Sequence, residues 1–181
     1  ATVNDWAAFG DKPATVKEVV KVATAAELTA AIEAGNNVAL TADINLDETR
    51  AAAGLILNND VVIEGAGHTL TTSAVRAIQI IDAKNVTIKN LTLNAGGERG
   101  IQVEAAANVL VENVVATAKN YALNNTSTGA NAKIAINNCD FSGLNVINVW
   151  GENAVVNIKD TTLRCKDDAA AEGYSVVSNN G

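Results

Sequence analysis

The residue types that most often perform acid–base or nucleophilic chemistry are scarce in this chain. His68 is the only histidine, so a Ser-His-Asp or Cys-His arrangement would have to use it. It follows Gly65 and Gly67 in a glycine-rich segment that is typical of a turn, and we interpret it as a structural residue. One histidine and two cysteines, with no close pair of ligands, do not form a conventional zinc site. We therefore expect no bound metal and no cofactor.

The composition narrows the classes of function further. The 181 residues carry 13 basic and 20 acidic side chains, a net charge of −7, so no positive field would attract nucleic acid or an anionic membrane surface. No apolar run approaches the roughly 20 residues that a membrane-spanning helix needs. Hydrophobic residues make up 48% of the chain, which is typical of a globular protein, and the length fits one domain. We expect no nucleic-acid partner and no membrane insertion.

The core-forming residues recur as a repeat. Blocks of alternating apolar and polar residues begin at positions 38, 61, 86, 109, 134 and 156, at intervals of 23, 25, 23, 25 and 22 residues. Alternation with a period of two is typical of a strand with one buried face. Aromatic residues make up only 3% of the chain, so the core must consist of thin, repeated layers. The blocks are Val38–Ala42, Val61–Gly65, Val86–Asn90, Val109–Asn113, Ile134–Asn138 and Val156–Asp160.

Each copy holds three short strands. In the third copy these are Val86–Ile88, Leu91–Leu93 and, after a variable loop, Gly100–Val103. One such turn cannot bury its apolar face alone, but stacked turns let every strand hydrogen-bond to its equivalents above and below. The sequence therefore predicts an all-β fold, a parallel β-helix (β-solenoid) of about six rungs of 22 to 25 residues. The third strand recurs at Leu55–Leu57, Ala77–Ile80, Gly100–Val103, Tyr121–Leu123, Val146–Val149 and Tyr174–Val177.

Asparagine marks the corners between the strands. Asn90, Asn113 and Asn138 occupy the same offset in their copies, where Gly65 and Asp160 stand in neighbouring ones. Asn, Asp and Gly best tolerate a left-handed backbone, and stacked Asn side chains hydrogen-bond to one another along the axis. We interpret Asn90, Asn113, Asn138 and Asp160 as a structural ladder. A second corner, interpreted in the same way, carries Asn37, Asp60, Asn85 and Asn108.

The N-terminal end of the stack carries the signals of a helix. Thr24 and Glu27 form a capping box, and Leu28 and Ile32 lie on one helical face. They predict a capping helix at about residues 25–34, which would cover the first rung because an open rung exposes apolar residues and strand edges.

The domain organisation follows from these elements. We expect an N-terminal segment at residues 1–36 and the β-helix at residues 37–181, in one domain. No comparable cap precedes Gly181. Either residues 167–173 cover the last rung, or further rungs or an abutting partner cover it.

The two cysteines are not placed to form a disulfide. Cys139 and Cys165 lie in successive copies, 5 and 9 residues after the starts at 134 and 156. Side chains at different offsets do not stack directly, so we expect two reduced, mostly buried thiols.

Three segments carry a resemblance to a known superfamily. They are Thr24–Gly35, Val38–Ile44 and Val61–Leu70, together with the Asn corners. In these segments the chain resembles the pectate-lyase-like right-handed parallel β-helix superfamily, from about Val16 to the C-terminus. The resemblance implies a right-handed coil, and a polysaccharide groove along the sheet that contains Gly100–Val103. It implies no single activity, because the superfamily includes polysaccharide lyases, glycoside hydrolases, esterases, phage tailspikes and non-catalytic adhesins.

A lyase of this kind would use acidic residues to hold calcium against a uronate, and an Arg or Lys to abstract a proton. The catalytic candidates are Asp82, Glu104 and Arg99, with Arg76 and Lys84 beside them in adjacent rungs. No rung carries the paired Asp of the related hydrolases and esterases. A small polysaccharide lyase or glycoside hydrolase is therefore an alternative, and calcium is expected only under it.

A binding site needs fewer specific residues than the catalytic site of a lyase. The outward positions of the third strands are predicted to be Gln79, Gln102, Ala122 and Asn148, and Trp150 follows them. Amides bond to sugar hydroxyls, and an exposed indole stacks on a sugar ring or contacts a protein. Gln79, Gln102, Asn148 and Trp150 are thus the predicted ligand-binding residues. The same amides would equally form a ladder that stabilises the sheet, and Trp150 would equally pack under a loop.

The leading prediction is a non-catalytic module that acts as a rigid spacer or adhesin-like domain. Its partner would be a polysaccharide or a protein bound along the third strands. The expected location is extracellular, on the cell surface or periplasmic. The alternatives are the lyase or hydrolase described above and a phage tail-fibre or receptor-binding fragment.

Overall fold

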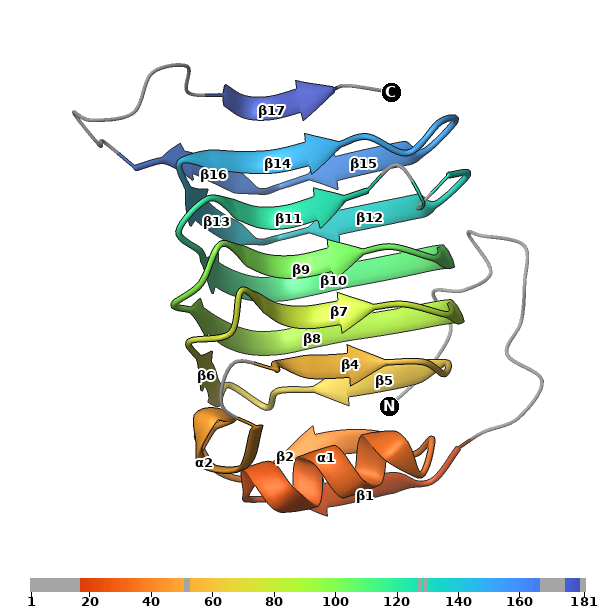
Figure 1. The fold of residues 1–181 in the computed structure, drawn as a ribbon, viewed down its shortest axis with the longest axis vertical. Helices are drawn as coiled ribbons and strands as arrows, with labels where there is room; N and C mark the ends of the chain where they lie inside the picture. The colour runs from red at the N-terminus through yellow and green to blue at the C-terminus, as the bar shows by residue number, and fades with distance from the viewer. Residues whose placement is uncertain (1–16, 51–52, 127, 129, 167–174, 180–181) are drawn as a thin grey trace.

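The computed structural model describes residues 17–50, 53–126, 128, 130–166 and 175–179. The chain coils into a right-handed parallel β-solenoid of about five turns, in which the strands of successive turns lie above one another (Figure 1). This confirms the predicted fold class. Each complete turn has three sides, and the apolar residues of all three enclose one central core. Among the described residues, no helix is long and apolar enough to span a membrane.

Two sheets make the three sides. On the first and second sides the strands are β1 Val19–Val22, β2 Asn37–Leu40, β3 Ile44–Asn45, β5 Val61–Glu64, β6 Thr69–Thr72, β8 Ala83–Ala95, β10 Ala106–Thr117, β12 Lys133–Asn137, β13 Asp140–Gly143, β15 Val155–Lys159 and β16 Thr162–Cys165. On the third side they are β4 Leu55–Leu57, β7 Arg76–Ile80, β9 Arg99–Val103, β11 Tyr121–Asn125, β14 Asn145–Val149 and β17 Ser175–Asn179.

The pairing order follows the order of the turns. The first side runs β1-β2-β5-β8-β10-β12-β15 and the third side runs β17-β14-β11-β9-β7-β4. The second side, with β3, β6, β13 and β16, belongs to the same sheet as the first, because β8 and β10 run around the corner between them. A residue on one strand therefore has its equivalents on the turns above and below.

The sequence repeat sets the register of the first side. The equivalent apolar residues of five copies are successive Cα partners: Val61, Val86, Val109, Ile134 and Val156. The first copy departs from the prediction, because Val38 pairs with Ile63 rather than with Val61. A shift of two residues keeps the same side chains facing inward, so the repeat pattern alone does not detect it.

Helix α1 (Ala25–Glu33) lies over the first turn, as predicted (Figure 1). Thr24 Oγ1 accepts a hydrogen bond from Glu27 N at 3.2 Å, and Leu28 and Ile32 are buried in the core. A short helix, α2 (Asp47–Arg50), follows β3 and was not predicted. The residues expected to cover the other end, 167–173, lie outside the described part of the chain.

Asparagine side chains form a hydrogen-bonded column at the corner between the first and second sides. Asn90, Asn113 and Asn138 have left-handed backbones, with φ between 51° and 53°, and Asp160 continues the series at 50°. Asn138 Nδ2 donates to Asn113 Oδ1 at 2.6 Å, and Asn113 Nδ2 donates to Asn90 Oδ1 at 3.0 Å. Asn90 Nδ2 donates in turn to Glu64 Oε1 at 2.9 Å. Each Asn thus relieves a backbone strain and joins two turns.

The expectation that Gly65 supplies the left-handed residue of its turn is wrong. That residue is Ala66, with φ of 52°, followed by Gly67 at 86°. A Cβ at Gly65 would lie 2.4 Å from the backbone oxygen of Asn90, so glycine is required there because the next turn approaches closely.

The second corner column is also hydrogen-bonded. Asn108 Nδ2 donates to Asn85 Oδ1 at 2.8 Å, and Asn85 Nδ2 donates to Asp60 Oδ2 at 3.1 Å. One turn earlier in the column, Asn37 Oδ1 on β2 accepts a hydrogen bond from Val62 N on β5 at 2.8 Å. The corner residues therefore connect the turns from β2 to β10.

Two substitutions of Asn113 separate the contribution of its side-chain hydrogen bonds from that of its left-handed backbone. Asn113→Gly removes the side-chain hydrogen bonds but keeps the left-handed backbone accessible, and we expect a loss of about 1 kcal/mol in the free energy of unfolding. Asn113→Ala adds the left-handed strain, a further ~1 kcal/mol. Urea denaturation followed by circular dichroism measures both. Equal losses, or a larger loss for glycine, would contradict the assignment.

Candidate functional site

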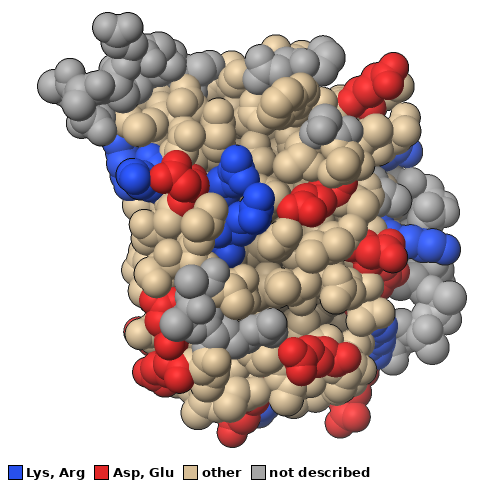
Figure 2. Space-filling model, in the orientation of Figure 1, with Lys and Arg blue, Asp and Glu red and all other residues tan. Residues whose placement is uncertain are grey.

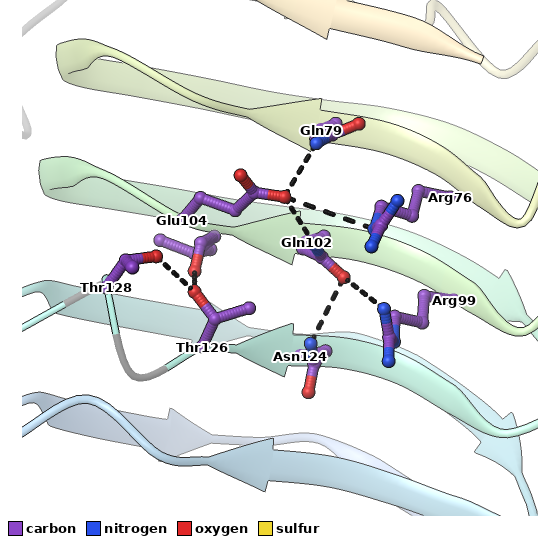
Figure 3. A network of polar contacts seen from close by, with 9 residues as sticks. Arg76, Gln79, Arg99, Gln102, Glu104, Asn124, Thr126 and Thr128 are labelled. Atoms are coloured by element: carbon purple, nitrogen blue, oxygen red, sulfur yellow. Dashed lines mark hydrogen bonds and ion pairs between the residues drawn. The ribbon is translucent and has the colours of Figure 1, made fainter. Parts of the chain in front are cut away.

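The outer surface of the third side carries most of the polar residues singled out by their sequence pattern. Each of β7, β9, β11 and β14 has two adjacent buried residues near its start, such as Ala77 and Ile78. The alternation is shifted by one residue there, and Arg99 lies on the same surface as Gln102, three positions later (Figure 3). We call this surface the third-side face, defined by Arg76, Gln79, Arg99, Gln102, Glu104, Asn124 and Asn148.

The predicted outward column needs one correction. Ala122 is fully buried, and Asn124 is the Cα partner of both Gln102 and Asn148. A strict period of two places Ala122 outward, but the second buried residue near the start of β11 moves the outward position to Asn124. Gln79, the Cα partner of Gln102 on the other side, completes the column.

A continuous network of hydrogen bonds crosses this face (Figure 3). Glu104 Oε1 accepts from Gln79 Nε2 at 2.6 Å and also from Gln102 Nε2. Gln102 Oε1 accepts from Arg99 Nη1 at 3.1 Å and from Asn124 Nδ2 at 3.2 Å. Both polar atoms of the Gln102 side chain are therefore engaged within the network.

The amide side chains of the column Gln102, Asn124 and Asn148 hydrogen-bond to one another. Asn148 Nδ2 donates to Asn124 Oδ1 at 2.7 Å, which extends the network to β14. Gln102, Asn124 and Asn148 are only 2%, 4% and 3% exposed. Because buried amides must be hydrogen-bonded, these contacts stabilise the sheet. For Gln102 and Asn148 the geometry supports the ladder role over direct contact with a sugar.

Arg76 and Arg99 place two positive charges on neighbouring strands of this face. They are Cα partners, and like charges directly opposite each other destabilise a sheet. The carboxylate nearest to them in the network is that of Glu104, whose Oε1 lies 4.0 Å from Arg76 Nε. The Arg99 guanidinium donates to the neutral oxygen of Gln102. Among the described residues, the buried Nε atoms of both arginines have no hydrogen-bond partner.

The third side faces the viewer in Figure 2. Basic side chains gather on this face, and acidic side chains lie at several places around them. The Arg76 side chain is 40% exposed and so reaches solvent. On a protein with a net charge of −7, this local excess of donors and positive charge is the feature best suited to bind an anionic group.

Trp150 directly follows β14 and is 55% exposed. Its backbone N donates to Asn125 O at 3.0 Å, which holds the start of the loop against the turn before. The indole is therefore not buried under a loop. It is the predicted ligand-binding residue with the largest exposed apolar surface, whereas Gln79 is half-buried.

The structure brings two of the three catalytic candidates together. Glu104 and Arg99 are joined through Gln102, and Glu104 Oε1 already accepts two hydrogen bonds. Asp82 lies between β7 and β8, and in the described residues it makes no hydrogen bond or ion pair with the other two. Within the same part of the chain, no group of three or more His, Cys, Asp or Glu side chains is placed to hold a metal ion.

The histidine and the cysteines lie apart from the third-side face. His68 Nδ1 is 3.4 Å from Asp43 Oδ1, and Asp43 also accepts a hydrogen bond from Thr69 N at 2.8 Å. Cys139 and Cys165 are both free thiols, as expected, but only Cys139 is buried; Cys165, at the end of β16, is exposed, so the expected burial is wrong for it. Burial raises the pKa of the Cys139 thiol, which disfavours the reactive thiolate.

Two shallow hollows lie on other parts of the surface. One, of about 440 Å³, follows the asparagine corner. The other, of about 570 Å³, is lined by Asp47, Lys119 and Lys166. Hydrogen bonding by Ser73 lowers the pKa of the Asp47 carboxyl, Lys119 pairs with Glu98 at 3.1 Å, and Lys166 Nζ donates to a backbone carbonyl at 2.9 Å. Each charged side chain of this hollow has a partner, but those of Asp47 and Lys166 are neutral groups. The third-side face is the stronger candidate because it places two arginines on neighbouring strands beside a single carboxylate of its network.

No protein-family model, curated protein or solved structure matches this chain. The β-solenoid fold and the geometry of the third-side face are therefore the basis for a function.

Glu104→Gln tests the electrostatics of the face while preserving its hydrogen-bond acceptor. Without the carboxylate, Arg76 and Arg99 repel each other unopposed, and we expect the free energy of unfolding to fall by about 1 kcal/mol at low salt. The loss should shrink in about 1 M NaCl, because salt screens exposed charges. The exposed Glu152→Gln is the matched control and should change stability by less than about 0.5 kcal/mol. A loss independent of salt would contradict the electrostatic explanation.

Proposed function

We propose that this protein is a non-catalytic β-helix module of pectate-lyase-like type, located outside the cell or on its surface, that binds a polysaccharide carrying carboxylate or sulfate groups. The ligand lies along the third-side face. The observation that carries the proposal is the pair Arg76 and Arg99, Cα partners that place two positive charges on neighbouring strands, with the Arg76 side chain 40% exposed. A planar guanidinium matches a carboxylate or sulfate in geometry, so one anionic group would satisfy both side chains.

The rest of the face supports binding of an extended chain. The amide column below it is held by its own hydrogen bonds, so the surface is rigid before a ligand arrives. Trp150 directly follows β14, which lies two strands, about 10 Å, from β9, and it stands five residues, about 17 Å, beyond the position that is level with Arg99. A sugar chain bound by its anionic group at the arginines would therefore have to extend about 20 Å, several rings, to stack on the indole.

The lyase or hydrolase alternative has less support. A lyase needs a free base and a carboxylate group that holds calcium, whereas Glu104 is engaged by Gln79 and Gln102, and Asp82 lies apart. A rigid spacer is the second candidate, and the hydrogen-bonded amide column from β7 to β14 favours it, because that column stiffens the stack without any ligand. No observation on the described residues favours a phage fibre fragment.

Direct binding measurements test the proposal. We expect the protein to bind uronate-rich or sulfated polysaccharides and not neutral ones, with affinity that falls as NaCl is raised. Arg99→Gln should weaken binding at least about 10-fold, since it removes a charge-assisted contact. Arg164→Gln, on the second side, is the matched control and should bind like the native protein, because Arg164 is paired with Asp140. Isothermal titration calorimetry measures all three.

The same samples separate binding from catalysis. We expect no release of unsaturated or reducing sugars, with or without added calcium. Turnover that stops on chelation of calcium would overturn the proposal in favour of the lyase. Absence of binding by the folded native protein would leave the spacer as the better account.

A further inference from the structure

An aromatic residue continues the column of the two arginines on the third side. Arg76, Arg99 and Tyr121 are successive Cα partners on β7, β9 and β11. Each begins its strand and is followed by two adjacent buried residues. Figure 3 shows the two arginines one above the other on neighbouring strands. Because Cα partners on parallel strands share a face, the Tyr121 ring starts from the same surface, one turn or about 4.8 Å from Arg99.

The packing of the core does not account for this ring. The core cluster contains the next two residues, Ala122 and Leu123, but not Tyr121. Tyr121 is half-buried, and among the described residues its hydroxyl group makes no hydrogen bond. The other two aromatic residues of the described part of the chain are Phe141, which is fully buried, and the exposed Trp150. Tyr121 is thus a partly exposed ring with a free hydroxyl group, placed beside two positive charges.

The acidic side chains around the column do not neutralise the arginines fully. Glu98 directly precedes Arg99, but its carboxylate is paired with Lys119 at 3.1 Å, so it has a positive partner of its own. The network of the third-side face brings one carboxylate, that of Glu104, close to Arg76. Two guanidinium groups and one carboxylate leave an excess of one positive charge next to the neutral Tyr121 ring. The column therefore combines attraction for an anion with an aromatic surface.

We propose that Tyr121 stacks on a sugar ring of the anionic polysaccharide, and that the sugar chain runs along the solenoid axis from the arginine pair to Tyr121. This inference rests on the proposed function of the third-side face. The height of one turn, about 4.8 Å, is similar to the length of one sugar residue in an extended chain. A sugar that places its anionic group on Arg76 and Arg99 therefore brings the neighbouring ring over Tyr121, whose apolar face contacts the sugar C–H groups.

The position of Trp150 separates the roles of the two aromatic residues. Trp150 lies five residues beyond the level of Arg99 along the strands, so a chain that follows the solenoid axis moves past Tyr121 and not toward the indole. A disaccharide or trisaccharide held by the arginines is too short to cross the distance of about 20 Å to Trp150. Short oligosaccharides therefore report on Tyr121 alone.

Two short anionic probes isolate this contact in the full-length protein. Trigalacturonate and a sulfated heparin disaccharide are titrated into the isotope-labelled protein, and the dissociation constant is measured by NMR. We expect Tyr121→Ala to weaken binding about 5-fold or more, because the stacked ring is lost. Tyr121→Phe keeps the ring and should stay within about 2-fold of the native protein. Val115→Ala, which also shortens an exposed side chain but on the second side, is the matched control and should bind like the native protein.

The sugar protons report stacking directly. Protons that lie over the face of an aromatic ring are shifted to higher field by its ring current. We expect this shift in sugar C–H resonances with the native protein and Tyr121→Phe, and its loss with Tyr121→Ala and Tyr121→Leu. Circular dichroism checks that the variants fold. If the alanine variant does not fold, Tyr121→Leu decides, because it keeps an apolar side chain without a ring.

The possible results separate this inference from the function on which it rests. If Arg99→Gln weakens binding of the probes but Tyr121→Ala and Tyr121→Leu do not, or if the ring-current shift persists without the tyrosine ring, the inference is wrong and the proposed function stands. The same conclusion follows if the native protein binds anionic polysaccharides but neither short probe. If the native protein binds neither the probes nor the polysaccharides, both proposals are overturned.

Discussion

The whole structure depends on one constraint: every strand pairs in parallel with its equivalent on the next turn. The pairing repeats each position at about 4.8 Å along the axis, so a side chain always meets the side chain of its own column. Inward columns must then be filled by Val, Ile, Leu and Ala of similar size, as in the series from Val61 to Val156. Corner columns must be occupied by residues that tolerate a left-handed backbone, which accounts for the positive φ of Asn90, Asn113 and Asn138.

The same constraint decides which polar residues stabilise the stack. A column of amides is favourable because each amide is both donor and acceptor, and the series from Gln102 through Asn124 to Asn148 is nearly excluded from water. A column of equal charges is unfavourable, because each charge repels the next. Arg76 and Arg99 violate this rule, and among the described residues the carboxylate nearest to them in the network is that of Glu104. A residue pair that weakens the fold locally is a stronger indication of function than one that completes a ladder.

Most of the fold could be predicted from the sequence, because the repeat interval fixes which residues stack and the period of two fixes which side chains point inward. The errors lie where a local feature changes the count by one or two residues. The adjacent buried pair at the start of β11 makes Asn124, not Ala122, the outward residue. In the turn after β5 the left-handed residue is Ala66, one position after the predicted Gly65. The arginines and Glu104 could be assigned to neighbouring turns, but their connection through Gln102 depends on side-chain directions that a repeat does not encode.

The three sides share one core but present different surfaces. The first side carries outward apolar residues such as Leu110, the second a hollow whose charged side chains are hydrogen-bonded or ion-paired, and the third a pair of arginines on neighbouring strands. A solenoid allows this because the core needs only the inward positions of each strand, so the outward positions are free to differ from side to side. Substitutions on separate sides that share no partner contribute to stability nearly additively. The outward residues of the first side and of the third-side face can therefore be altered independently, although both sides enclose the same core.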